Sequence, residues 1–311
     1  MTGPAPQGRR HGLLLLNKKS GITSFDSLRD VKKAFNTGKA GHTGTLDKFA
    51  TGLLLVLVGR GVKLAPLFSG LDKEYSATIM FGEETDTLDP EGTVIAQGPL
   101  PSRQEVEAVL DSFRGNILQA PPAYSALHIN GRRAHELVRE GKAPEMKKRP
   151  VTVHSLEISS WTPPHGVIQV RCSAGTYIRS LARDIALAAG TRARLSALTR
   201  NSVGAFRLKD SVEGESETLV NALRSLDRKL FQALSLPCFF IDGAAAEGFK
   251  HGKPLQRLLA SEFSAFGAAG NEALAVGVFR KNAAGETDEL LGILDCKDGK
   301  WSYGHVFAGN S

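Results

Sequence analysis

One short stretch organises this 311-residue chain: GHTGTLDKFATG, at positions 41–52. Its glycines let the backbone approach a ligand closely, and its threonines offer hydroxyls for local hydrogen bonds. It contains a single carboxylate, Asp47. The run that follows, Leu53–Val58, is continuously apolar and predicts a buried strand that holds the loop rigidly. A lone loop aspartate is more often an N-cap or Asx-turn residue, so a catalytic role for Asp47 needs support from the rest of the sequence.

Length and composition describe an ordinary globular protein, long enough for one large and one small domain. No apolar run approaches the length of a membrane span, and Leu13–Leu16 is too short for the core of a signal peptide. The three cysteines lie far apart, without the spacing of a zinc site or a disulfide framework: Cys172, Cys238 and Cys296. We therefore expect a cytoplasmic protein with no membrane contact and no bound metal.

Positive charge gathers in particular segments of a chain whose net charge is +7. Residues 1–70 carry eleven Lys or Arg against three Asp, and residues 121–150 carry seven against three Glu. A basic face attracts a polyanion through phosphate contacts and counterion release. The distribution supports nucleic-acid binding, although a charge excess alone more often marks a solvated surface.

Hydrophobic periodicity predicts the elements around the loop. An N-cap at Ser24 should start a helix that buries four apolar residues: Phe25, Leu28, Val31 and Phe35. Ser102 and Glu105 form a capping box before a second helix. A third helix begins near Thr176 and places Arg179 in its first turn, where the macrodipole disfavours a cation. Strands are expected at Leu13–Leu16, Leu53–Val58, Lys73–Phe81, Val151–Trp161, Val167–Ser173 and Arg194–Arg200.

The C-terminal part is expected to form a second unit. Four leucines predict one amphipathic helix that ends the large domain: Leu219, Leu223, Leu226 and Leu230. Pro237 suits a boundary. The pattern beyond it predicts a helix over Gly243–Gly252 and strands at Ala273–Phe279, Leu290–Asp295 and Trp301–Phe307.

Residues 119–150 have a different character from their surroundings. They begin with paired prolines, contain seven Lys or Arg, and predict only a short helix at Ala134–Arg139. This composition is typical of a mobile basic insertion that becomes ordered when RNA binds. A plain surface excursion is the alternative.

Further segments accompany residues 41–52 in a fixed order: Leu13–Ser24, Lys73–Tyr75, Thr85–Gly92, Tyr124–Leu127 and Gly175–Arg179. Over about residues 12–210 the chain thereby resembles the pseudouridine synthases, specifically the tRNA pseudouridine synthase B family, which modifies the T-loop uridine of tRNA. Two positions depart from the pattern, because family members usually carry proline where this chain has Lys19 and Lys48. Both changes add charge beside the loop and remove no catalytic group.

The resemblance implies an α+β fold in which helices flank a mixed, mainly antiparallel central sheet. Residues 1–235 would form this catalytic domain, with residues 119–150 as the thumb-like loop that closes on RNA. Residues 236–311 resemble the PUA module, a small RNA-binding β-barrel, through the run Phe249–Pro254. The resemblance of this tail is weaker than that of the large domain.

The resemblance also assigns roles to individual residues. Asp47 would be the essential group of the reaction and Arg179 its ion-pair partner. Tyr75 would pack on the flipped uracil and later remove its C5 proton. His42 would fill the space that the flipped base leaves in the RNA. Four further residues are implied in substrate binding: Lys18, Tyr177, Leu198 and Thr45.

The implied reaction converts uridine 55 of tRNA to pseudouridine, with no change of redox state and no cofactor. The implied partner is the T-stem-loop, bound by a monomer. Two other classes of function stay open. A retaining glycosidase needs a second carboxylate close to Asp47, which Asp86 or Asp89 could supply. A tRNA-binding folding chaperone could use the same fold, with catalysis secondary.

Overall fold

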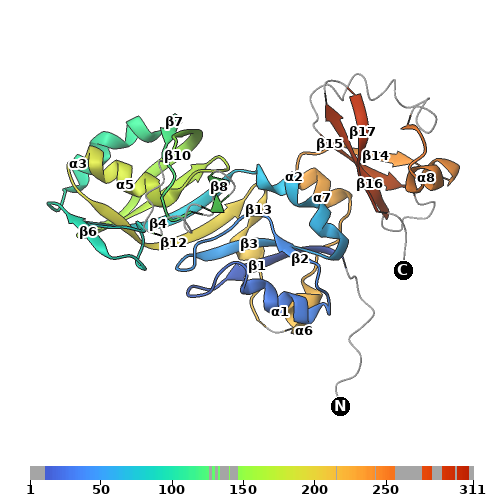
Figure 1. Cartoon of the computed structure of the whole chain (residues 1–311), viewed down its shortest axis with the longest axis horizontal. Coiled ribbons are helices and arrows are strands. Elements are labelled where there is room, and N and C mark those ends of the chain that lie inside the picture. The colour runs from blue at the N-terminus through green and yellow to red at the C-terminus, as the bar shows by residue number, and fades with distance from the viewer. Residues whose placement is uncertain are drawn as a thin grey trace, which may run out of the picture.

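A computed structural model gives the fold of residues 11–125, 128–129, 132–133, 140, 146–214, 216–241, 243–255, 275–281, 289–297 and 300–307. Two sheets dominate this described part of the chain (Figure 1). A nine-stranded sheet lies in the larger part, and a four-stranded sheet lies near the C-terminus. Among the described residues, no helix has the length and apolar character needed to cross a membrane.

The nine-stranded sheet is mixed and mainly antiparallel, as the sequence predicts. Its principal strands run in the order β1 (Gly12–Lys18), β3 (Thr51–Val58), β12 (Ala193–Val203), β4 (Lys73–Phe81), β11 (His165–Cys172), β10 (Arg149–Thr162) and β7 (Gly115–Gln119). Two short strands pair with inner strands of this order: β2 (Ala40–His42) with β3, and β13 (Phe206–Arg207) with β12. The β3–β12 contact is parallel and short, pairing Thr51 with Thr199 and Gly52 with Arg200. The end of the 41–52 loop therefore lies where the two halves of the sheet meet.

The helices cover parts of this sheet. They are α1 (Ser27–Ala34), α2 (Ala65–Ser69), α3 (Arg103–Leu110), α5 (Ile178–Ala188), α6 (Ser216–Asn221) and α7 (Arg228–Ala233), with 3-10 turns at Gly59–Leu64, Asp111–Phe113 and Leu208–Asp210. Two small antiparallel pairs complete the part: β5 (Glu83–Thr85) with β6 (Val94–Gln97), and β8 (His128–Ile129) with β9 (Arg132–Arg133). The predicted helix at 134–139 lies outside the described residues.

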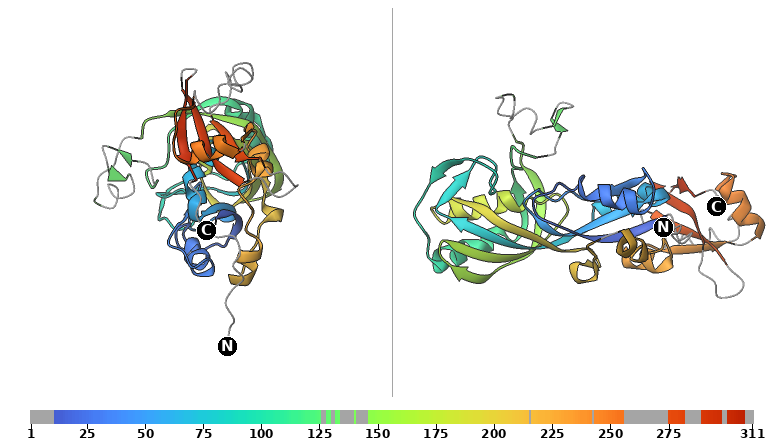
Figure 2. Two further views of the ribbon diagram at one scale, coloured as in Figure 1. Left: turned by 90° about the vertical axis from the view of Figure 1, so that its right-hand side faces the viewer. Right: turned by 90° about the horizontal axis from the view of Figure 1, so that it is seen from below.

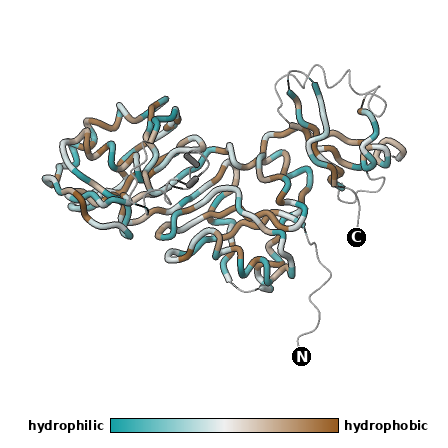
Figure 3. The backbone as a smooth tube through the Cα atoms, viewed as in Figure 1, coloured by the Kyte–Doolittle hydropathy of each residue, from teal (hydrophilic) through white to brown (hydrophobic). Residues whose placement is uncertain are grey.

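Strands β1 and β3 are buried on both faces, which explains their continuous apolar sequences (Figure 3). Leu13, Leu53 and Leu55 belong to one hydrophobic cluster, whereas Leu14 and Leu54 belong to another that also contains residues of α1 and α6. A shift in the register of such a strand would force both close-packed clusters to repack at once. The 41–52 loop is thus joined to one of the most constrained elements of the molecule.

The predicted start of the first helix is wrong. Ser24 does not cap α1, because its hydroxyl donates to Leu46 O (2.9 Å) and accepts from Leu46 N (2.8 Å). The helix begins at Ser27, and Phe25 remains 70% exposed instead of being buried. The capping box of Ser102 and Glu105 is present as predicted.

The single helix predicted over Leu219–Leu230 is also wrong, because two short helices, α6 and α7, occupy this stretch. Between them, Arg224 exchanges backbone hydrogen bonds with Leu13. Asp227 then caps α7 by accepting a hydrogen bond from Leu230 N. Pairing with β1 interrupts the helix even though the leucine spacing permits it.

The C-terminal sheet has the order β14 (Cys238–Ile241), β15 (Ala275–Arg280), β16 (Glu289–Lys297) and β17 (Lys300–Val306), with helix α8 (Gly243–Lys250) beside it. Three of its strands and α8 match the sequence prediction, whereas β14 was not predicted. The small sheet is compatible with a PUA-like module. Phe231 of α7 and Phe279 of β15 pack edge to face in a shared cluster. The boundary at residue 236 stays a prediction.

Gly52 ends the 41–52 loop in a conformation that favours glycine, with φ of 106°. A Cβ atom there would lie 2.5 Å from Arg200 O and 2.7 Å from Arg200 N. We expect Gly52→Ala to lower the free energy of unfolding by roughly 2 kcal/mol or more in urea titrations. Gly70→Ala is the control, since its φ is −80° and no atom lies within 4 Å of the added carbon. Equal urea midpoints for the two variants would refute this account.

Candidate active site

Asp47 and Arg179 form a two-point ion pair at the centre of the site. Arg179 Nε lies 2.9 Å from Asp47 Oδ2, and Arg179 Nη2 donates to Asp47 Oδ1 at 3.0 Å. The arginine side chain is 6% exposed, whereas that of Asp47 is 34% exposed. The arginine thus fixes the carboxylate from inside the protein and leaves part of it open to a ligand.

The remaining donors of Arg179 are engaged as well. Nη1 donates to Thr87 O (2.8 Å) and to Asp89 Oδ2 (3.1 Å), and Nη2 donates to Tyr124 O (3.0 Å). These acceptors come from two further segments of the chain. A guanidinium bound on several sides cannot rotate away from Asp47 without breaking buried hydrogen bonds.

The acidic loop after β5 provides this second carboxylate. Asp89 Oδ1 accepts hydrogen bonds from Thr87 Oγ1 (2.6 Å) and Glu91 N (3.0 Å), so both carboxylate oxygens of Asp89 have partners. Its side chain is 7% exposed. Sequence reasoning quoted this loop as part of the resemblance but gave Asp89 no role beside Arg179. The available signal was the first-turn arginine, because a guanidinium has five N–H donors and needs several acceptors when it is buried.

The environment of Asp47 acts in opposing directions on its acidity. Burial raises the pKa of the Asp47 carboxyl, and the Arg179 guanidinium opposes that rise. The charge of Asp89 adds to the rise, whereas Lys18 lowers the pKa. A carboxylate in this setting is a stronger base and nucleophile than a solvated one, and the adjacent cations favour its ionised form.

Lys18 is buried and holds the backbone of the 41–52 loop in place; it does not lie on the surface. Its Nζ donates to three backbone carbonyls, those of Lys19 (2.9 Å), Lys48 (3.2 Å) and Ala50 (2.7 Å). The residue is 1% exposed. Burial lowers the pKa of Lys18 to about 8, with Asp47 acting against the change. The predicted supporting role of Lys18 therefore corresponds to binding the backbone of Lys48 and Ala50, just after Asp47.

Arg200 makes a similar clamp on the other side of the loop, and sequence reasoning missed it. This 2% exposed arginine donates to Leu53 O (2.8 Å), Thr45 O (3.3 Å) and Gly44 O (3.0 Å). Thr45 thus contributes its backbone carbonyl to the loop structure, while the residue itself is exposed. Every residue has a backbone carbonyl, so the sequence does not show which of them a buried arginine binds. Only the position of Arg200 at the end of a predicted strand pointed to this role.

His42, at the end of β2, is half-buried beside the loop. Burial lowers the pKa of His42, and the charge of Arg200 lowers it further. No hydrogen-bond partner for its buried Nδ1 lies within the described residues. A neutral, flat ring in this position suits stacking against a base.

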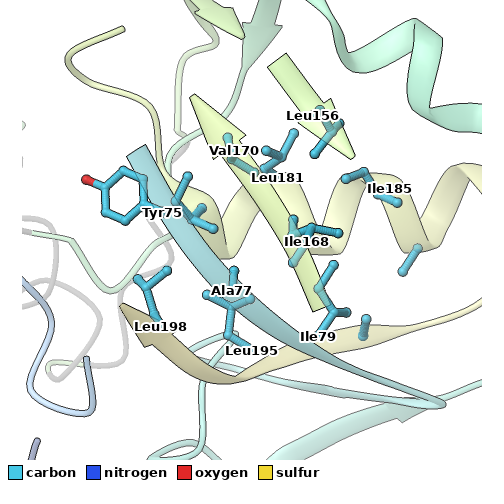
Figure 4. Packing of buried hydrophobic residues seen from close by; sticks show 14 of the residues in the cluster. Tyr75, Ala77, Ile79, Leu156, Ile168, Val170, Leu181, Ile185, Leu195 and Leu198 are labelled. Carbon is cyan, nitrogen blue, oxygen red and sulfur yellow. The ribbon is translucent and has the colours of Figure 1, made fainter. Parts of the chain in front are cut away.

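Tyr75, Leu198 and Tyr177 lie around the same region. Figure 4 shows the Tyr75 ring at the edge of the hydrophobic cluster, near Leu198, with its hydroxyl pointing away from the cluster. Burial raises the pKa of the Tyr75 phenol, and Arg200 opposes that rise. Tyr177 precedes α5 and exchanges hydrogen bonds with the buried side chain of Gln119, through its backbone N (2.8 Å) and O (3.1 Å).

The two lysines that stand at family proline positions pair with acidic residues on other segments. Lys48 Nζ lies 3.3 Å from Glu91 Oε1, and Lys19 Nζ lies 3.8 Å from Glu213 Oε2. All four side chains are at least 44% exposed, so these pairs contribute little to stability. The backbone carbonyls of both lysines still accept hydrogen bonds from Lys18.

The clamp of Lys18 predicts a pH-dependent stability. A lysine with a pKa lowered to about 8 in the folded protein destabilises it below pH 8, and this penalty is relieved as the pH rises from 8 toward the unfolded value of 10.5. We expect the wild type to gain roughly 2 kcal/mol relative to Lys18→Met between pH 7 and pH 9.5, measured by urea unfolding. A difference that is constant across this range would contradict a buried, titrating Lys18.

The site can be compared with known proteins. A family model described as "TruB family pseudouridylate synthase (N terminal domain)" matches residues 32–178. Three curated relatives, each called tRNA pseudouridine synthase B, come from Borreliella burgdorferi, Borrelia garinii and Francisella philomiragia. The first is 46% identical over 70% of this chain and 78% of its own length. The second is 41% identical over 86% and 94%, and the third is 43% identical over 75% and 76%.

Solved structures agree on the fold. A Cbf5-Nop10-Gar1 complex matches with a TM-score of 0.64 and 21% identity, over 97% of this chain and 84% of that chain. An H/ACA RNP bound to a substrate RNA containing 2'-deoxyuridine matches with a TM-score of 0.60 and 20% identity, over 94% and 82%. Identity at this level supports the fold alone, whereas the curated relatives are much closer in sequence. On those relatives, the chain belongs to the tRNA pseudouridine synthase B family.

Proposed function

We propose that this chain isomerises uridine to pseudouridine in tRNA, at position 55 of the T-loop, with Asp47 as the essential group. One observation carries the proposal: the Asp47 carboxylate is gripped at two points by a buried arginine and is still one-third exposed. The tRNA substrate is inferred from the names of the curated relatives.

The reaction breaks the bond between uracil N1 and ribose C1′ and forms a bond between C5 and C1′. N1 gains a proton and C5 loses one, so the atoms balance without an oxidant or a second substrate. Asp47 can add to the base at C6, add to the sugar at C1′, or remove a sugar proton. In each case the ionised carboxylate is the reactive form, so activity should fall as the pH drops through its raised pKa.

The other residues receive roles that follow from their environments. Tyr75 packs on the flipped uracil and accepts the C5 proton late in the reaction. Its raised pKa makes the phenolate rare but strongly basic. His42 enters the RNA stack in place of the flipped base, because its lowered pKa keeps the ring neutral. Leu198 and Tyr177 line the pocket around the base.

The glycosidase alternative finds a second carboxylate in Asp89, but that group is unsuited to acid–base work. It is buried, and it already accepts three hydrogen bonds from Arg179, Thr87 and Glu91. A general acid must instead be free to donate to the leaving group. The chaperone alternative needs no carboxylate fixed at two points, although RNA binding without turnover could accompany the enzyme activity.

We further propose that the protein acts as a monomer on the T-stem-loop, in the cytoplasm and without a metal or organic cofactor. Residues 1–235 would form the catalytic domain and residues 236–311 a PUA-like RNA-binding domain. Sedimentation of the complex with a T-stem-loop transcript tests the stoichiometry, for which we expect one protein per RNA.

The decisive experiment incubates the protein with an unmodified T-stem-loop transcript in buffer containing EDTA, followed by site-specific detection of pseudouridine. We expect conversion at the uridine equivalent to position 55 and at no other uridine. Release of free uracil would instead indicate a glycosidase. Tight binding without any product would leave the chaperone as the better description.

Substitutions of the ion pair should separate chemistry from RNA affinity. Asp47→Asn should lower the single-turnover rate by roughly 10⁴-fold or more while tRNA affinity stays close to that of the wild type, since the carboxylate contributes to the transition state. Arg179→Lys should recover little of the activity lost in Arg179→Ala, because a point charge does not replace the guanidinium fork. Asp111→Asn, at an exposed carboxylate, is the control. A few per cent of activity in Asp47→Asn would exclude it as the essential group.

The basic insertion, residues 119–150, should contribute affinity mainly through phosphate contacts. Replacing Arg132, Arg133, Lys147 and Lys148 with alanine should weaken tRNA binding and reduce the slope of log K against log salt. The slope should fall by about one unit for each contact removed, with the saturated single-turnover rate unchanged. The double variant Lys209→Ala/Lys229→Ala is the control. An unchanged slope in the quadruple variant would show that the insertion is not an RNA clamp.

A further inference from the structure

The Phe25 side chain lies largely in solvent, where an aromatic ring does not stabilise the isolated protein. It is 70% exposed, more than any other large hydrophobic residue in the described part of the chain. Helical spacing predicts that it is buried, and the late start of α1 overrides that prediction. Places where local sequence preference and structure disagree are often functional.

The position of Phe25 ties it to the catalytic loop. The preceding residue, Ser24, is hydrogen-bonded to both backbone groups of Leu46, and Gly21 N donates to Lys48 O at 2.9 Å. The segment thus contacts the residues on both sides of Asp47. Ile22, which is 37% exposed, adds a second apolar group to this segment. An exposed aromatic ring is thereby carried on the same rigid unit as the carboxylate.

The surroundings of the ring are basic. Lys32 Nζ lies 5.2 Å from the centre of the Phe25 ring, a cation–π distance. Residues 19–39 contain five Lys or Arg against two Asp. One of those acids, Asp26, is engaged by the backbone N and hydroxyl of Thr23. In Figure 2, strands β8 and β9 of the basic insertion stand away from the body of the larger part.

We propose that Phe25 is a stacking platform for an unpaired base of the tRNA substrate, next to the site where the target uridine is bound. Lys32, beside the ring, neutralises a neighbouring phosphate. The charge around the ring favours a polyanion over an apolar protein surface, and every base offers a flat face to an aromatic side chain. The proposal deepens the proposed function, because it takes RNA as the ligand of this face.

The test compares variants in binding to an unmodified tRNA transcript and in single-turnover rate. Phe25→Ala should raise Kd by roughly 10-fold, with the saturated rate and the salt slope unchanged, because stacking releases no counterions. Phe25→Tyr should restore affinity, whereas Phe25→Leu should not, since it supplies apolar area without a ring. Lys32→Gln should reduce the salt slope by about one unit. Ile95→Ala, at a 62% exposed residue of β6, is the matched control and should bind like the wild type.

Several outcomes would overturn the platform. Wild-type affinity in Phe25→Ala, full rescue by Phe25→Leu, or a large loss of thermal stability would each do so. Loss of self-association without loss of RNA binding would reassign the face to contact between copies of the chain. Failure of the proposed function is distinguishable, because it appears in the wild type as RNA binding without pseudouridine. The affinities and salt slopes of the Phe25 and Lys32 variants can be measured whether or not pseudouridine forms.

Discussion

The buried charge of Arg179 is the constraint on which the site depends. An arginine withdrawn from water is destabilising unless its donors are satisfied and its charge is balanced. Here two carboxylates balance the charge, and the two terminal nitrogens donate to them and to two backbone carbonyls, from the loops that contain Asp47, Thr87 and Tyr124. Those loops are far apart in sequence. Neutralising this one side chain therefore assembles the candidate site, and the same ion pair that orients the Asp47 carboxylate also holds the loops together.

A second set of contacts fixes the loop that carries Asp47. Lys18 and Arg200 both direct buried cationic groups at backbone carbonyls, one after the carboxylate and the other before it. A backbone carbonyl carries no net charge, so binding to it does not neutralise the cation. Lys18 and Arg200 therefore keep their positive charge near Asp47 without taking the place of Arg179 as its ion-pair partner. Precision in the loop thus comes from side chains that take no part in the chemistry.

The sequence predicted most strands of the large sheet and the helix that carries Arg179, and the structure brings Arg179 against Asp47 as the resemblance implied. Periodicity was sufficient where a strand is buried on one or both faces, as for Lys73–Phe81. It failed where tertiary contacts override local preference: Ser24 binds Leu46 instead of capping α1, and Arg224 pairs with Leu13 and divides a predicted helix. Asp89 and Arg200 were missed because their roles depend on partners distant in sequence. Such partners become visible only when the fold brings the segments together.

The geometry also explains why the Asp47 carboxylate lies close to two cations, Arg179 and Lys18. Asp47 is one-third exposed in the free protein, and a uracil seated against it would remove much of that remaining water. Desolvation would then raise its pKa further and favour the unreactive acid form. Arg179 cannot withdraw from the pair because its other donors are bound elsewhere, and Lys18 cannot leave its three carbonyls. The positive charge is thus already in place before the substrate arrives, so the carboxylate can stay ionised in the closed complex without further rearrangement of the protein.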